Sequence, residues 1–395
     1  MSLLIGWVIF LAALVISITL HEAGHLVTAK RFGIKATQFF AGFGPTLWST
    51  HKGETEYGIK ALPLGGFVKI VGMTSLEDVE PEDEPRSLRS KPGWQRVIVL
   101  VAGSAMHFVL AAALLFGLFL GVGLANQDTT KVGVVGSCVP ASETASGCHS
   151  SDPRSPARLA GLRVGDKIVT FAGQQVHSWT DLSSAIRSRK VGSTVAMTVQ
   201  RDGELITLHA KLAAIKGRSG AFLGIEPAIV FQHAGPIRAV TATGSFVGTV
   251  VSGSAAVITE LPKAIPKLFA HNRSSTAGGK VTSIVGAGNA TGQVLGANFG
   301  WQEKVTFTIF IVASLNIFVG LFNLLPLLPL DGGHIAVVLY ERLRAYIARL
   351  RGRADPGLVD MRKLLPVSFG IFAIIVFIGL MLIMADLVNP VHIIQ

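Results

Sequence analysis

Charged residues are scarce in this chain. They make up 15% of its 395 residues, whereas 50% are hydrophobic and the mean hydropathy is +0.53. Ordinary soluble domains contain about 25% charged residues, so the composition excludes a purely soluble protein. Four stretches are long and apolar enough to cross a bilayer, at about 3–29, 97–124, 305–330 and 366–385.

Lysine and arginine are absent from both ends of the chain, 1–4 and 387–395. They gather directly after the first span, before the second, and between the third and the fourth. Because loops rich in Lys and Arg stay in the cytosol, we expect 30–96 and 339–365 to be cytosolic and both termini to lie outside. This topology accounts for the net charge of +11, so no nucleic-acid partner is expected.

Cysteine occurs only twice, as Cys138 and Cys148, and both residues fall in the long extracytosolic segment. A disulfide persists in that oxidising compartment, so a structural bridge is one interpretation. Two free thiols or a redox-sensitive pair are the alternatives, and the spacing does not choose between them.

The first span lacks a basic start and a small-residue cleavage site, which argues against a cleaved signal peptide. It ends in HEAGH, which places His21, Glu22 and His25 on a membrane helix. Residues four apart lie on one helix face, so both imidazoles can bind one tetrahedral zinc ion. Zinc lowers the pKa of its water from about 15.7 to about 7, and Glu22 can pass that proton to the leaving amine. A charged group at the membrane centre costs at least about 2.5–3 kcal/mol, which favours this function over a helix end that merely reaches the interface.

The third span ends in NLLPLLPLDGGH, from Asn323 to His334. Prolines and glycines unwind a helix, and irregular backbone at membrane depth is tolerated only where it lines a cavity or packs in protein. A catalytic zinc site usually has a third protein ligand, and Asp331 is the candidate. A kinked transporter helix is the alternative. Transporters, however, usually show an internal repeat, which is not apparent in this sequence.

Two features are predicted in the first cytosolic loop. Residues 55–71 alternate in short β-type runs broken by Gly65-Gly66, which indicates a small membrane-associated hairpin or sheet. Residues 77–84, with the sequence EDVEPEDE, form an acidic run that we interpret as a solvated loop.

Residues 130–228 are predicted to form a compact α+β domain outside the cytosol. A short helix, a Gly-Asp turn, a strand, a second helix and two further strands follow in an order that resembles a circularly permuted bacterial PDZ domain. The segments AGLRVGDKI and AFLGIEP carry this resemblance. In such domains a loop like Phe222-Leu223-Gly224-Ile225 faces the terminal carboxylate of a peptide that extends a sheet edge.

Residues 239–259 contain no charge but are rich in Thr, Ser and Gly, so we expect a surface or amphipathic helix rather than a fifth span. With four spans, the first and third run in the same direction and place His25 and Asp331 near one depth. A fifth span would invert the third and separate them by most of the bilayer's roughly 30 Å.

Taken together, these motifs resemble the site-2 protease family of intramembrane metalloproteases, especially RseP-type members from actinobacteria. HEAGH, the FGP and GGF sequences, the PDZ-like insert and N-x-x-P-x-x-P-L-D-G-G carry the resemblance over nearly the whole chain. It implies one Zn²⁺ bound by His21, His25 and Asp331, with Glu22 as general base and Asn323 as a donor to the substrate backbone or the developing oxyanion. It also implies a substrate-binding surface formed by Gly65, Gly66, Phe67, Asn323 and Pro326, where a strand edge receives unwound substrate.

The second span departs from the family pattern. Where relatives usually read A-G-P-x-x-N, residues 102–107 read AGSAMH. His107 could be an extra polar contact in the cavity, but a packing histidine bonded to a neighbour is favoured. His334 lies close to Asp331, and we expect an outer or interfacial role for it because the family uses the aspartate as ligand.

The predicted fold is an α-helical polytopic membrane protein with four transmembrane helices, a membrane-associated β-hairpin and one inserted α+β PDZ-like extracytosolic domain. Its segments are span one (1–30), a cytosolic loop (31–96), span two (97–124), the PDZ-like domain (130–228), an interfacial segment (229–304), span three (305–338), a basic cytosolic loop (339–365) and span four (366–388). We expect it in the bacterial cytoplasmic membrane, with the active site near the cytosolic side.

The resemblance implies regulated intramembrane proteolysis. Substrates would be single-span membrane proteins such as anti-sigma factors already trimmed by an upstream site-1-type protease, and also remnant signal peptides. The PDZ-like domain would sense trimmed ends or exclude bulky ectodomains. A catalytically silent PDZ scaffold in the membrane is the remaining alternative, and such a scaffold would not need Glu22.

Overall fold

The computed structural model describes residues 2–73, 77–142, 148–149, 151–269 and 282–390. The chain divides into two compact units. Residues 1–119 and 235–394 form the membrane unit, and residues 120–234 form the inserted unit. The topology predicted for 391–395, and the interfacial assignment of 270–281, lie outside the described residues.

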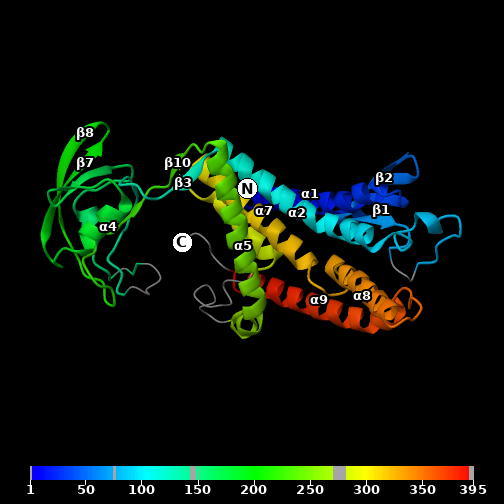
Figure 1. The fold of residues 1–395 in the computed structure, drawn as a ribbon. Coiled ribbons are helices and arrows are strands. Elements are labelled where there is room, and N and C mark those ends of the chain that lie inside the picture. Colours follow the sequence, from blue (N-terminus) through cyan, green and yellow to red (C-terminus); the bar gives the residue numbers. More distant parts are fainter. Residues whose placement is uncertain (1, 74–76, 143–147, 150, 270–281, 391–395) are drawn as a thin grey trace. The chain divides into compact units, whose positions relative to one another are not determined.

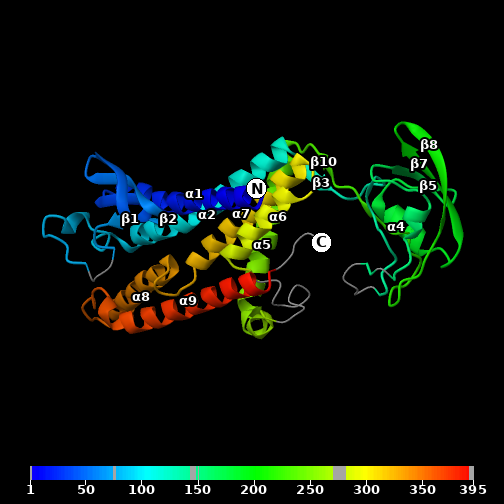
Figure 2. The same cartoon turned by 180° about the vertical axis from the view of Figure 1, so that it is seen from behind.

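Helices build most of the membrane unit (Figure 1). In chain order they are α1 (Ser2–Arg31), α2 (Gly93–Gly121), α5 (Pro236–Ala264), α6 (Ile284–Gly296), α7 (Trp301–Asn323), α8 (Asp331–Leu350) and α9 (Leu365–Val388). A helix satisfies its backbone groups internally, which is what a lipid environment requires. Figures 1 and 2 show α1 and α7 running in one direction and α2 and α9 in the other. This is the arrangement that four spans require.

Five helices of the described chain are long and apolar enough to cross a membrane, and α5 is one of them over Pro236–Val257. We predicted an interfacial helix for 239–259. In both views α5 runs across α7, and the Phe246 ring lies 4.7 Å from the Phe310 ring. The shared direction of α1 and α7 favours four spans, and the exact number stays a prediction.

The helix α6 holds the first half of α1 in place. A side-chain carbon on Gly6 would lie 2.5 Å from the Gly292 Cα, so the two helices touch backbone to backbone. The Trp7 indole N–H donates to the Asn289 side chain over 3.2 Å. Asp386 of α9 accepts a hydrogen bond of 2.6 Å from the Ser283 N–H at the start of α6, where a carboxylate satisfies backbone donors and the helix dipole.

The third predicted span, 305–338, is two helices in the structure. The first, α7, ends at Asn323, residues 324–330 form a loop, and α8 begins at Asp331. The glycines of the DGG sequence allow α8 to start against this loop, because a side-chain carbon on Gly333 would lie 2.6 Å from the Leu328 nitrogen. The predicted basic loop 339–365 needs the same correction, since α8 continues to Leu350.

The hairpin that follows α1 is larger than predicted. Strands β1 (Ala36–Lys52) and β2 (Thr55–Ile70) pair antiparallel, from Ala36 opposite Ile70 to Lys52 opposite Thr55. Residues 38–41 are register partners of both 66–69 and 56–59, so the long strands bend back on themselves. Gly65 and Gly66 lie inside β2, next to an interruption of the register, since Gly66 pairs with Ala41 and the next paired residue of β2 is Leu62.

The acidic run 77–84 is more than a solvated loop. The Asp83 carboxylate pairs with Lys35 over 2.6 Å, and Glu84 pairs with Arg89 over 2.6 Å. The hydrogen bonds from Arg89 hold the pKa of Glu84 below its ordinary value. Glu77 accepts a 2.7 Å hydrogen bond from the Gly72 N–H, just after β2. The run thus ties both ends of the hairpin to the segment that precedes α2.

The inserted unit is a small α+β fold. Its elements are β3 (Leu124–Asn126), β4 (Val132–Val135), α3 (Pro156–Leu159), β5 (Lys167–Phe171), β6 (Gln174–Gln175), α4 (Trp179–Arg187), β7 (Thr194–Arg201), β8 (Glu204–Lys211), β9 (Ile225–Pro227) and β10 (Val230–Gln232). The main sheet has the order β6-β5-β7-β8, while β4 pairs with β9 and β3 with β10. Ile168, Phe171, Leu182 and Met197 are fully buried between the sheet and α4. The β3–β10 pair joins the entry and exit of the unit, so it begins before and ends after the predicted 130–228.

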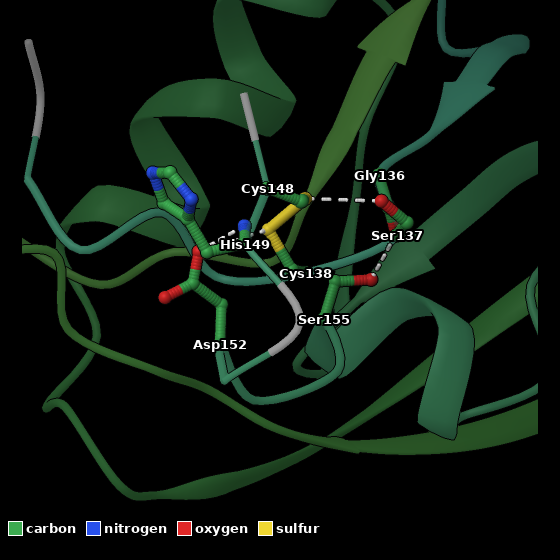
Figure 3. The surroundings of a disulfide bond; sticks show 7 residues. All are labelled: Gly136, Ser137, Cys138, Cys148, His149, Asp152 and Ser155. Carbon is green, nitrogen blue, oxygen red and sulfur yellow. Dashed lines mark hydrogen bonds between the residues drawn. A yellow bond between two sulfur atoms is a disulfide. The ribbon is translucent and has the colours of Figure 1, made fainter. Parts of the chain in front are cut away.

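The two cysteines form a disulfide. Cys138 and Cys148 are bonded, with Cα atoms 5.8 Å apart, and Asp152 accepts a hydrogen bond from the His149 N–H beside them (Figure 3). The structure therefore chooses the bridge among the alternatives that the sequence left open.

Candidate active site

Three side chains from two distant segments meet at one point of the membrane unit. His21 and His25 lie one turn apart on α1, and their Nε2 atoms are 3.1 Å apart. The Asp331 Oδ2 atom, at the start of α8, lies 3.3 Å from the His21 Nε2 and 3.4 Å from the His25 Nε2. Among the described residues these three make up the one group with metal-ligand geometry.

The separations fit a tetrahedral zinc ion. Zinc bonds of about 2.0–2.1 Å place neighbouring ligand atoms about 3.3–3.4 Å apart. The His25 Nδ1 lies 2.7 Å from the Val99 carbonyl oxygen, and because a carbonyl only accepts, Nδ1 carries the proton. The Nε2 lone pair of His25 therefore faces the other two ligand atoms, an arrangement that a cation stabilises. The buried Asp331 Oδ2 receives no hydrogen bond from the described residues.

The helix α2 closes one side of this site through its small residues. A side-chain carbon on Gly103 would overlap the His25 Nε2 and lie 2.8 Å from the His21 Cε1. On the facing helix, a carbon on Gly24 would lie 2.5 Å from the Ala102 oxygen. The paired glycines let α1 and α2 approach until backbone touches imidazole. We did not predict this contact, although the Ala102-Gly103 pair was visible in the sequence.

An ion pair joins α2 to the helix that carries Asp331. Arg96 donates to Glu341 of α8 over 2.7 Å, and both side chains are largely buried. Glu341 also accepts a 2.9 Å hydrogen bond from the Val359 N–H. His334 lines a cavity with Arg96 and Glu341 and lies outside the metal-ligand group.

Glu22 lies beside the second strand of the hairpin. Its Oε2 accepts a hydrogen bond of 3.0 Å from the Val68 N–H. A side-chain carbon on Gly66 would lie 3.7 Å from the Glu22 Cγ. The predicted Gly65-Gly66-Phe67 segment is thus placed next to the predicted base. The part played by the Val68 amide could not be predicted, because any residue except proline offers a backbone N–H.

Asn323 precedes the loop that leads to the site, and Pro326 lies within this loop. Asn323 is the last residue of α7, and Pro326 lies within the loop before Asp331. The hydrogen bonds of the described residues include none from the Asn323 side chain. The predicted roles of both residues in substrate binding stay predictions.

His107 is hydrogen-bonded to a side chain of α7 and lies next to one of the candidate zinc ligands. Its Nδ1 lies 2.9 Å from the Asn316 Oδ1, while the Asn316 amide nitrogen donates to the Val312 carbonyl over 2.8 Å. The favoured interpretation, a buried histidine bonded to a neighbour, fits this geometry. The His107 ring also lies 5.1 Å from the His21 ring, so the residue forms part of the wall around the ligands.

The predicted peptide loop lines a groove in the inserted unit. Phe222, Leu223, Gly224 and Ile225 face it together with Trp179, Ile186 and Arg187 of α4. Hydrogen bonds pin the loop from behind, because the Gly136 N–H donates to the Gly224 oxygen and the Ala157 N–H to the Leu223 oxygen. Arg218 lies over the Phe222 ring at 5.7 Å, which places positive charge at the groove.

Apolar helices that bring two imidazoles, one carboxylate and a neighbouring glutamate together define the class of membrane zinc metalloproteases. In agreement, residues 9–354 match the family model of Peptidase family M50, and the chain belongs to that family. The enzyme is therefore a zinc metalloprotease of the membrane.

Curated relatives match most or all of the chain. It is 35% identical to zinc metalloprotease Rip1 of Mycobacterium bovis over 422 residues, which cover 100% of both chains. It is 36% identical to zinc metalloprotease Rip1 of Mycolicibacterium smegmatis, with 99% of each chain covered. A putative zinc metalloprotease of Fusobacterium nucleatum is 30% identical over 82% of this chain and 85% of its own.

Among solved structures, the PDZ domain of the SdrC-like protein from Listeria monocytogenes is 26% identical. This match covers 25% of the present chain and 93% of that domain, with a TM-score of 0.17.

Proposed function

We propose that this protein performs regulated intramembrane proteolysis by cutting the transmembrane segments of single-span membrane proteins. The observation that supports this most directly is the meeting of His21, His25 and Asp331 at zinc-ligand separations, within helices that are apolar enough for a bilayer. Full-length similarity to zinc metalloproteases named Rip1 supports the same conclusion.

In this proposal His21, His25 and Asp331 hold the zinc ion. When bound, zinc supplies Lewis-acid activation of water and of the scissile carbonyl. Glu22 accepts a proton from the attacking water and delivers it to the leaving amine. Asn323, at the end of α7, donates a hydrogen bond to the substrate backbone or to the developing oxyanion.

The hairpin presents the substrate. A peptide bond inside a helix is shielded and already hydrogen-bonded, so cleavage requires an extended segment. The edge of β2 at Gly65-Gly66-Phe67 offers replacement main-chain hydrogen bonds where lipid offers none. Its closeness to Glu22 supports this role, since the Val68 amide contacts the predicted base directly.

The inserted unit selects which substrates reach the site. Its groove at Phe222–Ile225, with Arg187 and Arg218 nearby, suits a peptide whose C-terminal carboxylate was exposed by an earlier cut. A size filter against bulky ectodomains is the alternative mode. Deleting 130–228 should allow untrimmed substrate to be cut if the unit is a filter, whereas an unchanged need for trimming would count against that mode.

We place the enzyme in the bacterial cytoplasmic membrane, with both termini and the inserted unit outside the cytosol. Its substrates would be anti-sigma factors trimmed by a site-1-type protease, and remnant signal peptides. A broken-helix transporter and a silent PDZ scaffold are disfavoured, because neither needs Glu22 beside a three-residue metal site.

The decisive experiment replaces the wild type with Glu22→Gln in cells and compares the membrane proteomes. Trimmed single-span fragments should accumulate in the variant, while zinc content stays at the wild-type level. Glu204→Gln, an exposed position on β8 of the inserted unit, is the matched control and should accumulate none. Continued cleavage by Glu22→Gln would remove Glu22 from the mechanism.

A further inference from the structure

The Val68 N–H, on the outer edge of β2, is a hydrogen-bond donor for which the Glu22 carboxylate and an added substrate strand would compete. Neighbouring residues of a strand direct their backbone groups to opposite sides. Val68 is the register partner of Phe39 in β1, yet its N–H donates to Glu22 over 3.0 Å. The Val68 N–H therefore lies on the edge of β2 that faces α1. The opposite edge of β2 is the one that β1 already fills.

The Glu22 side chain comes close to β2 at more than one residue. A side-chain carbon on Gly66, two residues before Val68, would lie 3.7 Å from the Glu22 Cγ and 2.9 Å from the Phe40 oxygen. The glutamate side chain thus runs past Gly66 and ends at Val68. The one hydrogen bond of this approach is made at the Val68 N–H, where an added strand would have to pair.

An added substrate strand needs the same donor. Strand addition uses the outward N–H and C=O groups of alternate residues, so a substrate carbonyl would take the Val68 N–H. One N–H makes one well-aligned hydrogen bond, and here the carboxylate already occupies it. The Val68 N–H cannot donate to the substrate and to Glu22 at the same time.

We propose that seating a substrate strand on β2 transfers the Val68 N–H from Glu22 to the substrate and so frees the glutamate carboxylate to act as base. The proposal rests on the proposed function and adds a regulatory step to it. In the free enzyme the Val68 amide stabilises the Glu22 carboxylate within the bilayer, where an unpaired charge is costly. Extended substrate then replaces the carboxylate at the strand edge, so the base is released only where a peptide is ready to be cut.

Val68→Pro tests this exchange, because proline removes the outward N–H and strand edges accept proline at such positions. Two fluorogenic probes are compared in purified, zinc-loaded full-length enzyme. One is a blocked dipeptide amide, too short to pair along 66–70, and the other is an apolar peptide of about ten residues that spans the strand edge. Thr50→Pro, in β1 and paired with Tyr57, is the control for general disturbance of the hairpin.

The two probes should respond to Val68→Pro in opposite ways. We expect kcat for the short probe to rise about 3–10-fold, and KM for the long peptide to rise by a similar factor, as loss of one hydrogen bond implies. Thr50→Pro should not raise turnover of the short probe. If Val68→Pro lowers kcat for both probes, the amide positions the base for reaction and the exchange is wrong. An unchanged KM for the long peptide would overturn strand addition at this edge.

Zinc content of each variant separates these outcomes from loss of fold. Should Val68→Pro lose zinc, an ester in place of the amide of residue 68 removes the same donor without the proline ring, and the same two responses are expected of it. Failure of the proposed function looks different, because zinc-loaded wild type would then cleave neither probe.

Discussion

Gly103 of α2 lies directly against the His25 imidazole, so closely that a side-chain carbon at this position would overlap Nε2. The geometry of the ligand pair is thus set by a helix that contributes no ligand. Because His25 also donates its other ring N–H to the Val99 carbonyl of α2, one turn of α2 determines both where this imidazole lies and which nitrogen faces the metal.

The first prediction concerns this contact. Gly103→Ala should push the imidazoles from their positions and weaken zinc binding by about 10–100-fold, as loss of an outer support does. Gly117→Ala, in the same helix with nothing within 4 Å of the added carbon, should bind zinc like the wild type. Zinc titration with a competing chelator measures both, and equal affinities of the two variants would contradict the packing argument.

Asp331 supplies the second prediction. Asp331→Asn keeps the size of the side chain but removes the anionic ligand, so zinc affinity should fall by more than the roughly 10–100-fold that an outer partner is worth. Metal analysis after dialysis against a chelator reports the loss. Asp355→Asn, at an exposed position after α8, is the control, and full zinc occupancy in Asp331→Asn would exclude the aspartate as ligand.

The buried pair Arg96–Glu341 gives a third prediction. Removing one partner of a buried ion pair leaves an unpaired charge, which costs about 3–5 kcal/mol. Arg96→Met and Glu341→Met should therefore each lower the thermal midpoint of the zinc-loaded protein and loosen α8, which carries Asp331. The double variant should be more stable than either single variant, as a double-mutant cycle would show. Additive losses would mean that the pair does not couple α2 to α8.

The fourth prediction is a pH dependence of the inserted unit. Burial opposes ionisation of Asp166, but hydrogen bonds from Arg201 and from the Arg163 N–H outweigh it and lower the Asp166 pKa. A lowered folded pKa stabilises the fold above the unfolded pKa of about 3.9, and this contribution is lost as the pH falls through the folded value. Hydrogen exchange of the unit, corrected for intrinsic rates, should show local stability falling below about pH 4.

Asp166→Asn should remove this acid-sensitive contribution, so the variant is less stable near neutral pH and changes less on acidification. Asp202→Asn, in the exposed turn after β7, should retain the wild-type profile. An identical pH profile in Asp166→Asn and wild type would show that the Arg201 pair does not set acid stability.

The sequence could bring candidate residues together where they are local in the chain. His21, Glu22 and His25 lie within one helical turn, and helix geometry alone places both imidazoles on one face. Asp331 followed from a different argument, since an acid next to helix-breaking residues at membrane depth needs a partner. The third span was predicted as one segment with a break. Prolines and glycines show that a helix breaks, but they do not show that a loop of 324–330 separates two helices.

Amino-acid order by itself determined the membrane class, the ligand types and their spacing on α1, because these depend on composition and on helical periodicity. Only the tertiary structure decided that β2 delivers its Val68 amide to Glu22, that Gly103 faces His25, and that Cys138 is bonded to Cys148. Those relationships depend on backbone groups and on the approach of segments far apart in the chain. A backbone N–H is common to every residue except proline, so its partner becomes known only once the chain is folded.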